Sequence, residues 1–223
     1  MPQKRETKTA SLRHEREYFA YGIHNIFGID EAGRGAWAGP VSAGVVCLPL
    51  AETKLGKYLS GVRDSKQMTA RQRKKLSGTI KDVAIAWGIG SASNDEIDDI
   101  GINPATKLAM KRALEESMAK ADFDIPDALF LDSLLWPEML HIPQVSIIGG
   151  DQRSLSIAAA SVLAKTWRDD VMRQLDEEYP EYEFAVHKGY GTAKHHAALK
   201  QYGVSSVHRK TYRPVREILD HED

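Results

Sequence analysis

Carboxylate side chains stand at the ends of three short apolar segments. Asp30 and Glu31 follow the segment FGI. Asp132 follows ALFL, and Asp151 follows VSIIGG. If these segments are neighbouring strands of one sheet, the four side chains converge at a single place. Any one acid alone is better explained as a strand-end cap or turn former, so only their combination favours a shared site.

A cluster of three or four carboxylates needs a counter-charge. Like charges at close range force protons onto some of the groups or push the groups apart. A hard divalent cation removes that repulsion. Because no Cys or His lies at ligand spacing from the acids, oxygen-only ligation favours Mg²⁺ or Mn²⁺ over Zn²⁺.

An arginine held between two glycines follows the first acid pair, in the stretch DEAGRG. Glycine beside a polar side chain indicates either a dihedral closed to other residues or a close approach to the backbone itself. Gly33 and Gly35 therefore predict that something bulky approaches the main chain around Arg34.

Basic residues gather in two patches although the net charge of the 223-residue chain is only -1. Residues 187–216 hold seven Lys or Arg and four His with no acid, and residues 63–81 hold seven bases against the single acid Asp64. Charge runs are usually solvated faces. Two large one-sign patches nevertheless favour a polyanionic partner, because phosphate neutralisation needs clustered bases.

The composition, 42% apolar, is that of a globular protein with a real core. No window is apolar enough to span a membrane and the N-terminus has no apolar signal segment, so we expect a cytoplasmic protein. The single cysteine, Cys47, is expected in the core. We expect residues 1–22 to form a polar, weakly docked extension to one domain, residues 23–223.

The hydrophobic pattern predicts strands near residues 26–30, 41–48, 83–91, 128–131 and 145–148. Helices are expected between them. Asn103 and Pro104 predict an N-cap and first helical position, and Thr69 and Thr192 predict caps of helices over residues 70–81 and up to 203. A long helix through residues 157–175 stops at Pro180. The fold class is α/β, a mixed sheet with helices packed on its faces.

Six motifs, taken in order, resemble those of bacterial ribonuclease HII, a type 2 ribonuclease H. They are GIDEAGRGAWAGPV (residues 28–41), DSKQMTARQR (64–73), EIDDIGINPATKLAMKRA (96–113), LFLDS (129–133), GGDQRSLSIAAASVLAKTWRD (149–169) and HKGYGTAKH (187–195). The resemblance implies a ribonuclease H-like, five-stranded mixed sheet flanked by helices, a core over about residues 23–180, and a basic helical C-terminal lobe over about residues 181–223.

The resemblance also implies an activity. It makes the chain an endoribonuclease that hydrolyses the RNA strand of RNA–DNA hybrids and nicks on the 5′ side of ribonucleotides embedded in duplex DNA. Such an enzyme acts in ribonucleotide excision repair and RNA primer removal. Two divalent ions, Mg²⁺ or Mn²⁺, would be held by Asp30, Glu31, Asp132 and Asp151. The products would carry 5′-phosphate and 3′-hydroxyl ends.

Substrate contacts follow from the same resemblance. Gly33, Arg34 and Gly35 would meet the ribonucleotide, with loop backbone groups hydrogen-bonding its 2′-OH. Tyr190 would pack on the deoxyribose that follows and so detect an RNA–DNA junction, although an ordinary interface tyrosine is the alternative. Phosphate contacts are expected from Ser65, Lys66, Lys165 and Lys188. For Lys165, an exposed helix lysine is an equally good interpretation.

Some positions depart from the family pattern or lie outside it. Ser133 stands where many relatives have glycine. Where a lysine often precedes the Gly-Asp of the fourth acid, this chain has Gly150, which removes one positive charge near the metals. Asp169 lies about five helical turns beyond Asp151, and Arg168 beside it suggests a surface or buttressing pair. No sliding-clamp ligand peptide follows Arg216, and a monomer is expected.

Two other classes remain open from the sequence alone. A different metal-dependent nuclease or transposase of the same general fold would use the acids but lack a 2′-OH reader. A catalytically silent nucleic-acid-binding module would keep the basic patches without a reason to retain all four acids.

Overall fold

Strands from both halves of the chain form one mixed sheet in the computed structural model, which describes residues 9–120 and 125–220. The strands are β1 (Ile26–Ala32), β2 (Val41–Cys47), β3 (Ala86–Ala92), β4 (Ala128–Asp132) and β5 (Gln144–Ile147). Their order across the sheet is β3-β2-β1-β4-β5. β1 and β2 pair antiparallel, as do β2 and β3, whereas β4 runs parallel to both β1 and β5. The predicted mixed sheet of five strands is confirmed.

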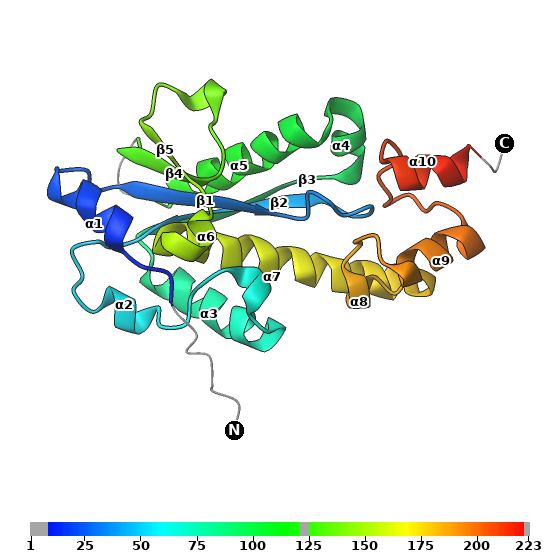
Figure 1. Cartoon of the computed structure of the whole chain (residues 1–223), viewed down its shortest axis with the longest axis horizontal. Helices are drawn as coiled ribbons and strands as arrows, with labels where there is room; N and C mark the ends of the chain where they lie inside the picture. Colours follow the sequence, from blue (N-terminus) through cyan, green and yellow to red (C-terminus); the bar gives the residue numbers. More distant parts are fainter. Residues whose placement is uncertain (1–8, 121–124, 221–223) are drawn as a thin grey trace.

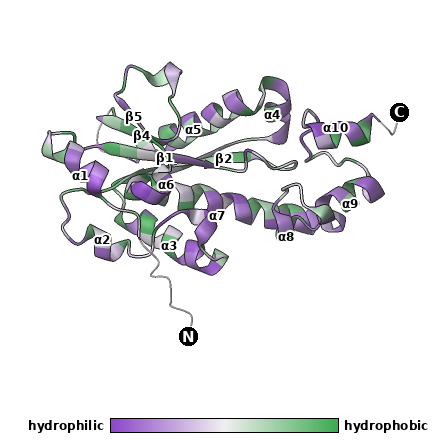
Figure 2. Ribbon diagram, in the orientation of Figure 1, coloured by the Kyte–Doolittle hydropathy of each residue, from purple (hydrophilic) through white to green (hydrophobic). Residues whose placement is uncertain are grey.

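Helices cover both faces of this sheet, and Figure 1 shows α5 on one side and α7 on the other. The helices are α1 (Arg13–Ala20), α2 (Leu55–Tyr58), α3 (Ala70–Val83), α4 (Asn94–Ile100), α5 (Ile102–Met118), α6 (Gly150–Arg153), α7 (Leu155–Glu178), α8 (Phe184–His187), α9 (Ala193–Tyr202) and α10 (Arg213–Leu219), with 3₁₀ turns η1 (Ser65–Gln67), η2 (Pro137–Met139) and η3 (Pro180–Tyr182). In Figure 2 the helices alternate purple and green along their length, as amphipathic helices do.

Side chains alternate along each strand, so the sheet has an apolar core on each face. Ile26 of β1 belongs to the core under α7, whereas Phe27 and Ile29 belong to the core under α5. Cys47 is buried in the α5 core, as expected. A third apolar cluster, which includes Met172, lies in the predicted helical lobe formed by α8, α9, α10 and the end of α7. No helix in the described part of the chain is long and apolar enough to cross a membrane.

Two glycines allow α7 to lie directly on the sheet. A Cβ atom at Gly28 of β1 would come within 2.2 Å of the backbone of Ser156, and one at Gly44 of β2 would come within 2.3 Å of the carbonyl oxygen of Ala160. Only glycine permits so close a contact between strand and helix backbones. This contact fixes the distance between α7 and β1. The positions of the functional residues on both elements depend on that distance.

Two predicted boundaries are wrong. The long helix α5 begins at Ile102, with Gly101 as its N-cap, so Asn103 and Pro104 lie inside the first turn and are not the cap and first position. Pro104 is tolerated there because the first turn has no intrahelical partner for its backbone nitrogen. Strand β3 begins at Ala86 because α3 continues to Val83. Thr69 and Thr192 do cap α3 and α9, as expected.

The prediction of a weakly docked N-terminal extension is wrong for residues 9–20. Helix α1 packs on the sheet, where Tyr18 makes an edge contact with Phe130 at a centroid distance of 5.1 Å. Glu15 is fully buried, and its Oε1 accepts hydrogen bonds from the Ser154 hydroxyl (2.6 Å) and from the backbone N–H of Ser156 (2.9 Å). Glu15 therefore places a carboxylate at the N-terminus of α7, where the helix dipole stabilises negative charge. The expected extension at residues 1–8 lies outside the described residues.

We predict that Glu15→Ala lowers the free energy of unfolding by about 2–4 kcal/mol, because three buried donors lose a charged acceptor. Urea unfolding followed by circular dichroism measures the change. The matched control is Glu17→Ala, an exposed acid on the same helix, which should shift stability by less than about 0.5 kcal/mol. Equal effects from the two substitutions would contradict the proposed capping of α7.

Candidate active site

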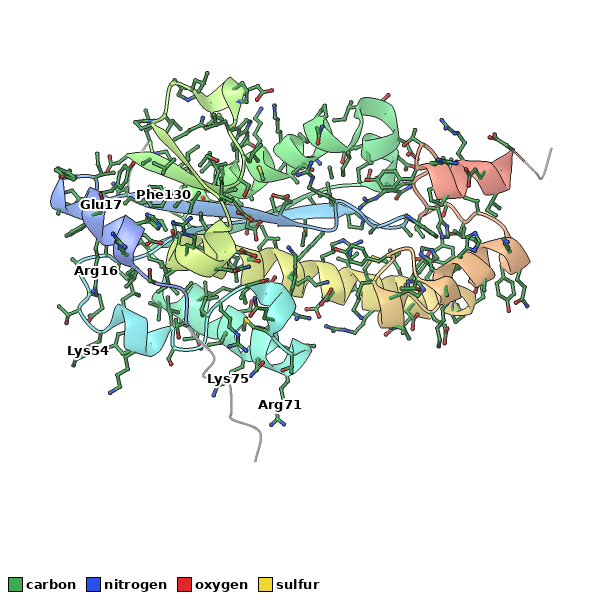
Figure 3. The ribbon with its side chains drawn as sticks, viewed as in Figure 1. Arg16, Glu17, Lys54, Arg71, Lys75 and Phe130 are labelled. Carbon is green, nitrogen blue, oxygen red and sulfur yellow. The ribbon has the colours of Figure 1, made fainter. Side chains whose placement is uncertain are left out.

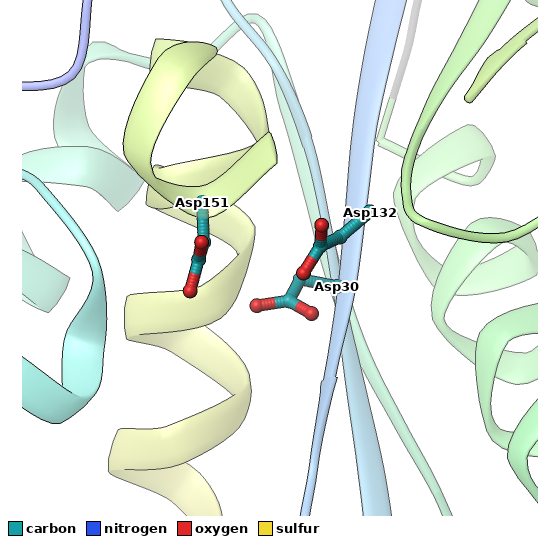
Figure 4. A group of neighbouring side chains, drawn as sticks. All are labelled: Asp30, Asp132 and Asp151. Atoms are coloured by element: carbon teal, nitrogen blue, oxygen red, sulfur yellow. The ribbon is translucent and has the colours of Figure 1, made fainter. Parts of the chain in front are cut away.

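Three aspartates meet at the edge of the sheet where the parallel strands end. Asp30 and Asp132 are the next residues after the paired positions of β1 and β4, and Asp151 lies in the first turn of α6 (Figure 4). One carboxylate oxygen from each lies within 4.8 Å of the other two. The prediction that separate acidic segments converge is therefore confirmed for these three residues.

The fourth acid, Glu31, lies outside that group of three. Consecutive strand residues face opposite sides of a sheet, so Asp30 points toward α7 and Glu31 toward α5. The Oε1 atom of Glu31 accepts a hydrogen bond from Arg34 at 3.3 Å, and Arg34 also donates to the side chain of Asn103 at 2.7 Å. Glu31 and Arg34 nevertheless line one cavity together with Asp132, which keeps Glu31 beside the cluster.

Burial, together with the negative charge of neighbouring acids, raises the pKa values of Asp30 and Asp151. The pKa of Asp30 lies well above its usual range, mainly because the group is buried and then because Glu31 and Asp132 are negative, while a hydrogen bond from Ser161 acts in the opposite direction. Burial and the negative charge of Asp64 raise the pKa of Asp151 to about 6. Buried carboxylates that repel one another in this way fit a hard divalent cation, which prefers oxygen donors and removes the repulsion.

One positive side chain faces the cluster. Burial would lower the pKa of Lys66, but the combined charge of nearby aspartates, Asp30 and Asp151 foremost, raises it above its usual range. Asp64, just before it in sequence, is buried and accepts hydrogen bonds from the backbone N–H of Lys66 (2.9 Å) and the side chain of Gln67 (3.0 Å). The DSK segment thus presents a cation to the acids from a rigid turn.

A cavity of about 490 Å³ opens beside the acids. Its lining comes from the glycine-flanked loop, the DSK turn, α3, α7 and the segment after α8: Glu31, Ala32, Gly33, Arg34, Gly35, Ser65, Lys66, Arg73, Lys165 and Tyr190. Seven of the predicted substrate-contacting residues therefore share one cavity. Lys188 is not among them, since its Nζ is turned toward the backbone carbonyl of Ala185.

The two glycines that flank Arg34 differ in what a side chain at each position would meet. Gly33 takes a φ of +93°, and a Cβ atom there would lie 2.0 Å from Nε of Arg168. Gly33 therefore confirms the alternative of a dihedral closed to other residues, and the protein's own packing leaves no room for a side chain there. Among the residues that the structure describes, a Cβ at Gly35 would meet nothing within 4 Å, which leaves the main chain open to the cavity there.

Basic residues next to Tyr190 are held by buried contacts. Lys165 donates to Asp169 at 2.7 Å, and its Nζ lies 5.6 Å from the centre of the Tyr190 ring. Lys165 is therefore half-buried in the cavity wall, and the alternative of an exposed helix lysine is wrong. Asp169 also accepts from Arg73 at 2.8 Å, so its buttressing partners are Arg73 and Lys165 and not the expected Arg168.

Ser133 and Gly150, the two departures from the family pattern, lie around Asp132. Ser133 takes a φ of +52°, a conformation that favours glycine, and its hydroxyl donates to Asp132 at 3.1 Å. The backbone N–H of Gly150 donates to the same carboxylate at 2.8 Å. A Cβ at Gly150 would lie 2.6 Å from the Cδ1 atom of Ile157, so a side chain there would require Ile157 to move.

The sequence analysis did not predict the roles of three buried arginines of this region. Arg73 holds the DSK turn by donating to the carbonyls of Ser65 and Met68 at 2.9 and 2.5 Å. Arg168 and Arg209 donate mainly to backbone carbonyls of the glycine-flanked loop and its continuation. A buried arginine has no distinctive local pattern, because its partners lie far away in the sequence. The exposed members of the 63–81 patch, such as Arg71 and Lys75, project from α3 into solvent (Figure 3).

Comparison with known proteins identifies the family. The family model for ribonuclease HII matches residues 27–215. The chain belongs to the ribonuclease HII family. A curated ribonuclease HII from Desulfitobacterium hafniense (strain DSM 10664 / DCB-2) is 49% identical over 212 residues, which cover 95% of this chain and 77% of the relative. One from Chloroflexus aurantiacus is 46% identical over 209 residues, covering 94% and 95%.

Solved structures agree on the fold. The crystal structure of ribonuclease H2 from Pyrococcus horikoshii OT3 superposes with a TM-score of 0.69 at 24% identity, covering 88% of this chain and 98% of that one. Bst-RNase HIII in complex with Mn²⁺ gives 0.69 at 17% identity, covering 99% and 74%. The sheet and helices are those of a ribonuclease H-like fold. Family membership makes the chain a metal-dependent ribonuclease H, a hydrolase that acts on RNA–DNA hybrids.

We predict that Asp151→Asn stabilises the metal-free protein at pH 7 by roughly 1–2 kcal/mol. The pKa of Asp151 is raised from 3.8 to about 6 on folding, so its ionisation opposes folding, and stability falls as the pH rises between these values. At pH 4 the two proteins should have nearly equal melting temperatures.

Thermal melting in the presence of a chelator measures this difference, and repetition with Mn²⁺ should reverse it, because wild type gains more from the cation. Asp99→Asn, at an exposed position, is the control. A variant less stable than wild type at pH 7 without metal would show that Asp151 is not destabilised by its neighbours.

Proposed function

We propose that this chain is an endoribonuclease that hydrolyses the RNA strand of RNA–DNA hybrids and nicks duplex DNA on the 5′ side of embedded ribonucleotides. It would leave 5′-phosphate and 3′-hydroxyl ends and serve ribonucleotide excision repair and RNA primer removal. The observation that carries the proposal is the meeting of Asp30, Asp132 and Asp151 beside a cavity lined by the glycine-flanked loop and Tyr190.

Asp30, Asp132 and Asp151 would hold two divalent ions, Mg²⁺ or Mn²⁺, with Glu31 completing the set from the α5 side of β1. When bound, such ions activate water for in-line attack on the phosphodiester and stabilise the departing 3′ oxygen. The carboxylates must ionise to bind them, and Lys66 helps by favouring negative charge nearby. The solved structure of Bst-RNase HIII, which shares the fold, is that of a complex with Mn²⁺.

The glycine-flanked loop would recognise the ribonucleotide. The 2′-OH both donates and accepts hydrogen bonds, so exposed backbone groups can distinguish RNA from DNA. The open space at Gly35 supports this role, since a sugar edge could reach the main chain there. Arg34, fixed by Glu31 and Asn103, would contact the adjoining phosphate or sugar with a guanidinium of defined orientation.

Tyr190 would test the sugar on the 3′ side of the ribonucleotide. Its ring forms part of the cavity wall and lies 5.4 Å from the guanidinium of Arg168 and 5.6 Å from Lys165. A deoxyribose packs more closely than a ribose against such a ring because it lacks the 2′-OH. Ser65, Lys66 and Lys165 would contact phosphates in the same cavity, and Lys188 would do so after its Nζ leaves Ala185.

A silent nucleic-acid-binding module is less well supported. Such a protein would gain nothing from carboxylates that raise one another's pKa and repel the phosphate backbone. A nuclease or transposase without a 2′-OH reader would not need the Tyr190 cavity wall opposite the glycine-flanked loop. Cleavage of defined duplexes separates the three possibilities.

We predict that the protein nicks a labelled DNA duplex with one ribonucleotide on the 5′ side of that ribonucleotide in Mg²⁺ or Mn²⁺, and leaves an all-DNA duplex intact. Asp132→Asn should reduce the rate at least about 100-fold while binding changes little, because it removes a cation ligand and no phosphate contact. Gel analysis of products and fluorescence anisotropy measure the two effects.

The control is Glu115→Gln, at an exposed acid on α5 that pairs with Lys111. It should cleave like wild type. Equal cutting of the all-DNA duplex, or full activity of Asp132→Asn, would refute the assigned chemistry.

We predict that Tyr190→Ala reduces cutting at a single embedded ribonucleotide about 10-fold, since a stacked ring contributes roughly 1–3 kcal/mol. Cutting within a long hybrid should fall less, and the metal concentration for half-maximal rate should not change. Steady-state rates on the two substrates give the comparison. Tyr202→Ala, at an exposed tyrosine of the same lobe, is the control. If Tyr190→Ala leaves the ratio of the two rates unchanged, Tyr190 does not detect the RNA–DNA junction.

A further inference from the structure

The continuation of the glycine-flanked loop, residues 36–39, runs between two segments of the C-terminal lobe. On one side, Trp37 donates its backbone N–H to Gly189 at 2.7 Å, and Ala36 forms a β-bridge with Tyr190. On the other side, Arg209 donates its backbone N–H to Trp37 at 2.8 Å. The loop thus has the Tyr190 segment along one edge and residues 207–209 along the other.

The side chain of Arg209 extends this contact to the ribose-sensing residues 33–35. The guanidinium is fully buried and donates to the carbonyl of Gly39 at 3.0 Å and to that of Arg34 at 2.8 Å. The hydroxyl of Tyr212 donates to the same Arg34 carbonyl at 2.5 Å. Two donors therefore fix the one carbonyl that lies between Gly33 and Gly35.

The side chain of His208, the preceding residue, reaches the Tyr190 segment. The backbone N–H of Ser205 donates to Nδ1 of His208 at 3.1 Å, so the ring proton of His208 is on Nε2. That Nε2–H lies 3.0 Å from Nε2 of His195, which must accept. The proton of His195 is then on Nδ1, which donates to the carbonyl of Tyr190 at 3.1 Å.

Burial keeps this histidine chain uncharged. It lowers the pKa of His195 to about 4 and that of His208 to about 3, with the neighbouring histidines adding to the effect. The tautomers that the hydrogen bonds require therefore persist over the neutral pH range. The direction of the chain, from Ser205 through both rings to Tyr190, follows from the donors and acceptors alone.

We propose that His208 and Arg209 form one positioning unit that fixes the distance between the ribose-sensing residues 33–35 and the junction tyrosine Tyr190. His208 and Arg209 are consecutive residues, so one peptide bond joins a contact to Arg34 with a contact, through His195, to Tyr190. Neither residue lines the cavity, so both act through other residues.

The proposal rests on the proposed function and refines it. A ribonucleotide and the deoxyribose that follows it are covalently linked, so the two protein groups that contact them must keep a fixed spacing. A small misplacement of recognition groups lowers the rate of the chemical step more than it weakens binding, because phosphate contacts elsewhere remain.

Tyr212→Phe tests the Arg34 side of the unit. It removes one of the two donors to the Arg34 carbonyl and leaves the ring in place. We expect kcat on a single embedded ribonucleotide to fall about 3- to 10-fold with KM within about 2-fold, and cutting of a long hybrid to fall less. Tyr179→Phe is the matched control, since its hydroxyl bonds Ser206 at 2.8 Å in the same lobe. Equal rate ratios for Tyr212→Phe and wild type would overturn the proposal.

Two substitutions of His195 test the other side. Asn places an amide N–H near the position of Nδ1 and can still donate to Tyr190, whereas Gln places its amide near Nε2 and can meet only His208. We expect His195→Asn to keep more of the single-ribonucleotide preference than His195→Gln, by about 3-fold or more, at similar melting temperatures. A loss of preference that follows melting temperature alone would mean that the hydrogen-bonded histidines have only a structural role. That result would overturn the proposal.

The outcomes distinguish this proposal from the proposed function. If wild type shows no preference for an embedded ribonucleotide over all-DNA duplex, the proposed function fails. If wild type has the preference, and Tyr212→Phe and both His195 variants retain it in full, the function stands and the positioning unit is rejected.

Discussion

The mutual repulsion of carboxylates at one edge of the sheet is the constraint on which the site depends. Asp30 and Asp132 are brought together by parallel pairing of β1 and β4, and the α6 turn adds Asp151. Left alone, these groups favour protonation or separation. The fold resists that tendency with backbone contacts: Gly150 donates to Asp132, and the N–H of Glu31 donates to Asp30 at 2.8 Å. The repulsion between the carboxylates is therefore concentrated at the place where a cation can relieve it.

Much of this site follows from sequence pattern, and the exceptions have physical causes. Apolar strands that end in acids predict where Asp132 lies, because parallel strands end at one edge. Strand periodicity turns Glu31 to the opposite face of β1 from Asp30, so Glu31 lies beside the group of three aspartates and not within it. Gly33 was identified from its neighbours, yet its cause, the side chain of Arg168, lies more than 130 residues away and has no local pattern.

The N-terminal segment illustrates a second limit. Glu15 lies in a charged stretch that resembles an exposed helix, and its partner Ser154 is 139 residues further along the chain. A buried acid is favourable only where several donors converge on it, and the sequence does not report that convergence. The start of α5 at Ile102 and the end of α3 at Val83 were missed for the related reason that capping depends on backbone geometry that Gly101 and Ala84 adopt only in the folded chain.

Helix α7 connects cleavage and recognition. Ser161, Lys165 and Arg168 follow one another at helical spacing on one face. Ser161 hydrogen-bonds Asp30, Lys165 lies in the cavity wall, and Arg168 passes beneath Gly33 to hold the carbonyls of Ala38 and Lys188. Seven residues of helix span about 10 Å, so the separation between the acid cluster and the recognition loop is set by a rigid rod. Because Gly28 and Gly44 seat that rod directly on the sheet, displacement of α7 would disturb the acids and the loop together.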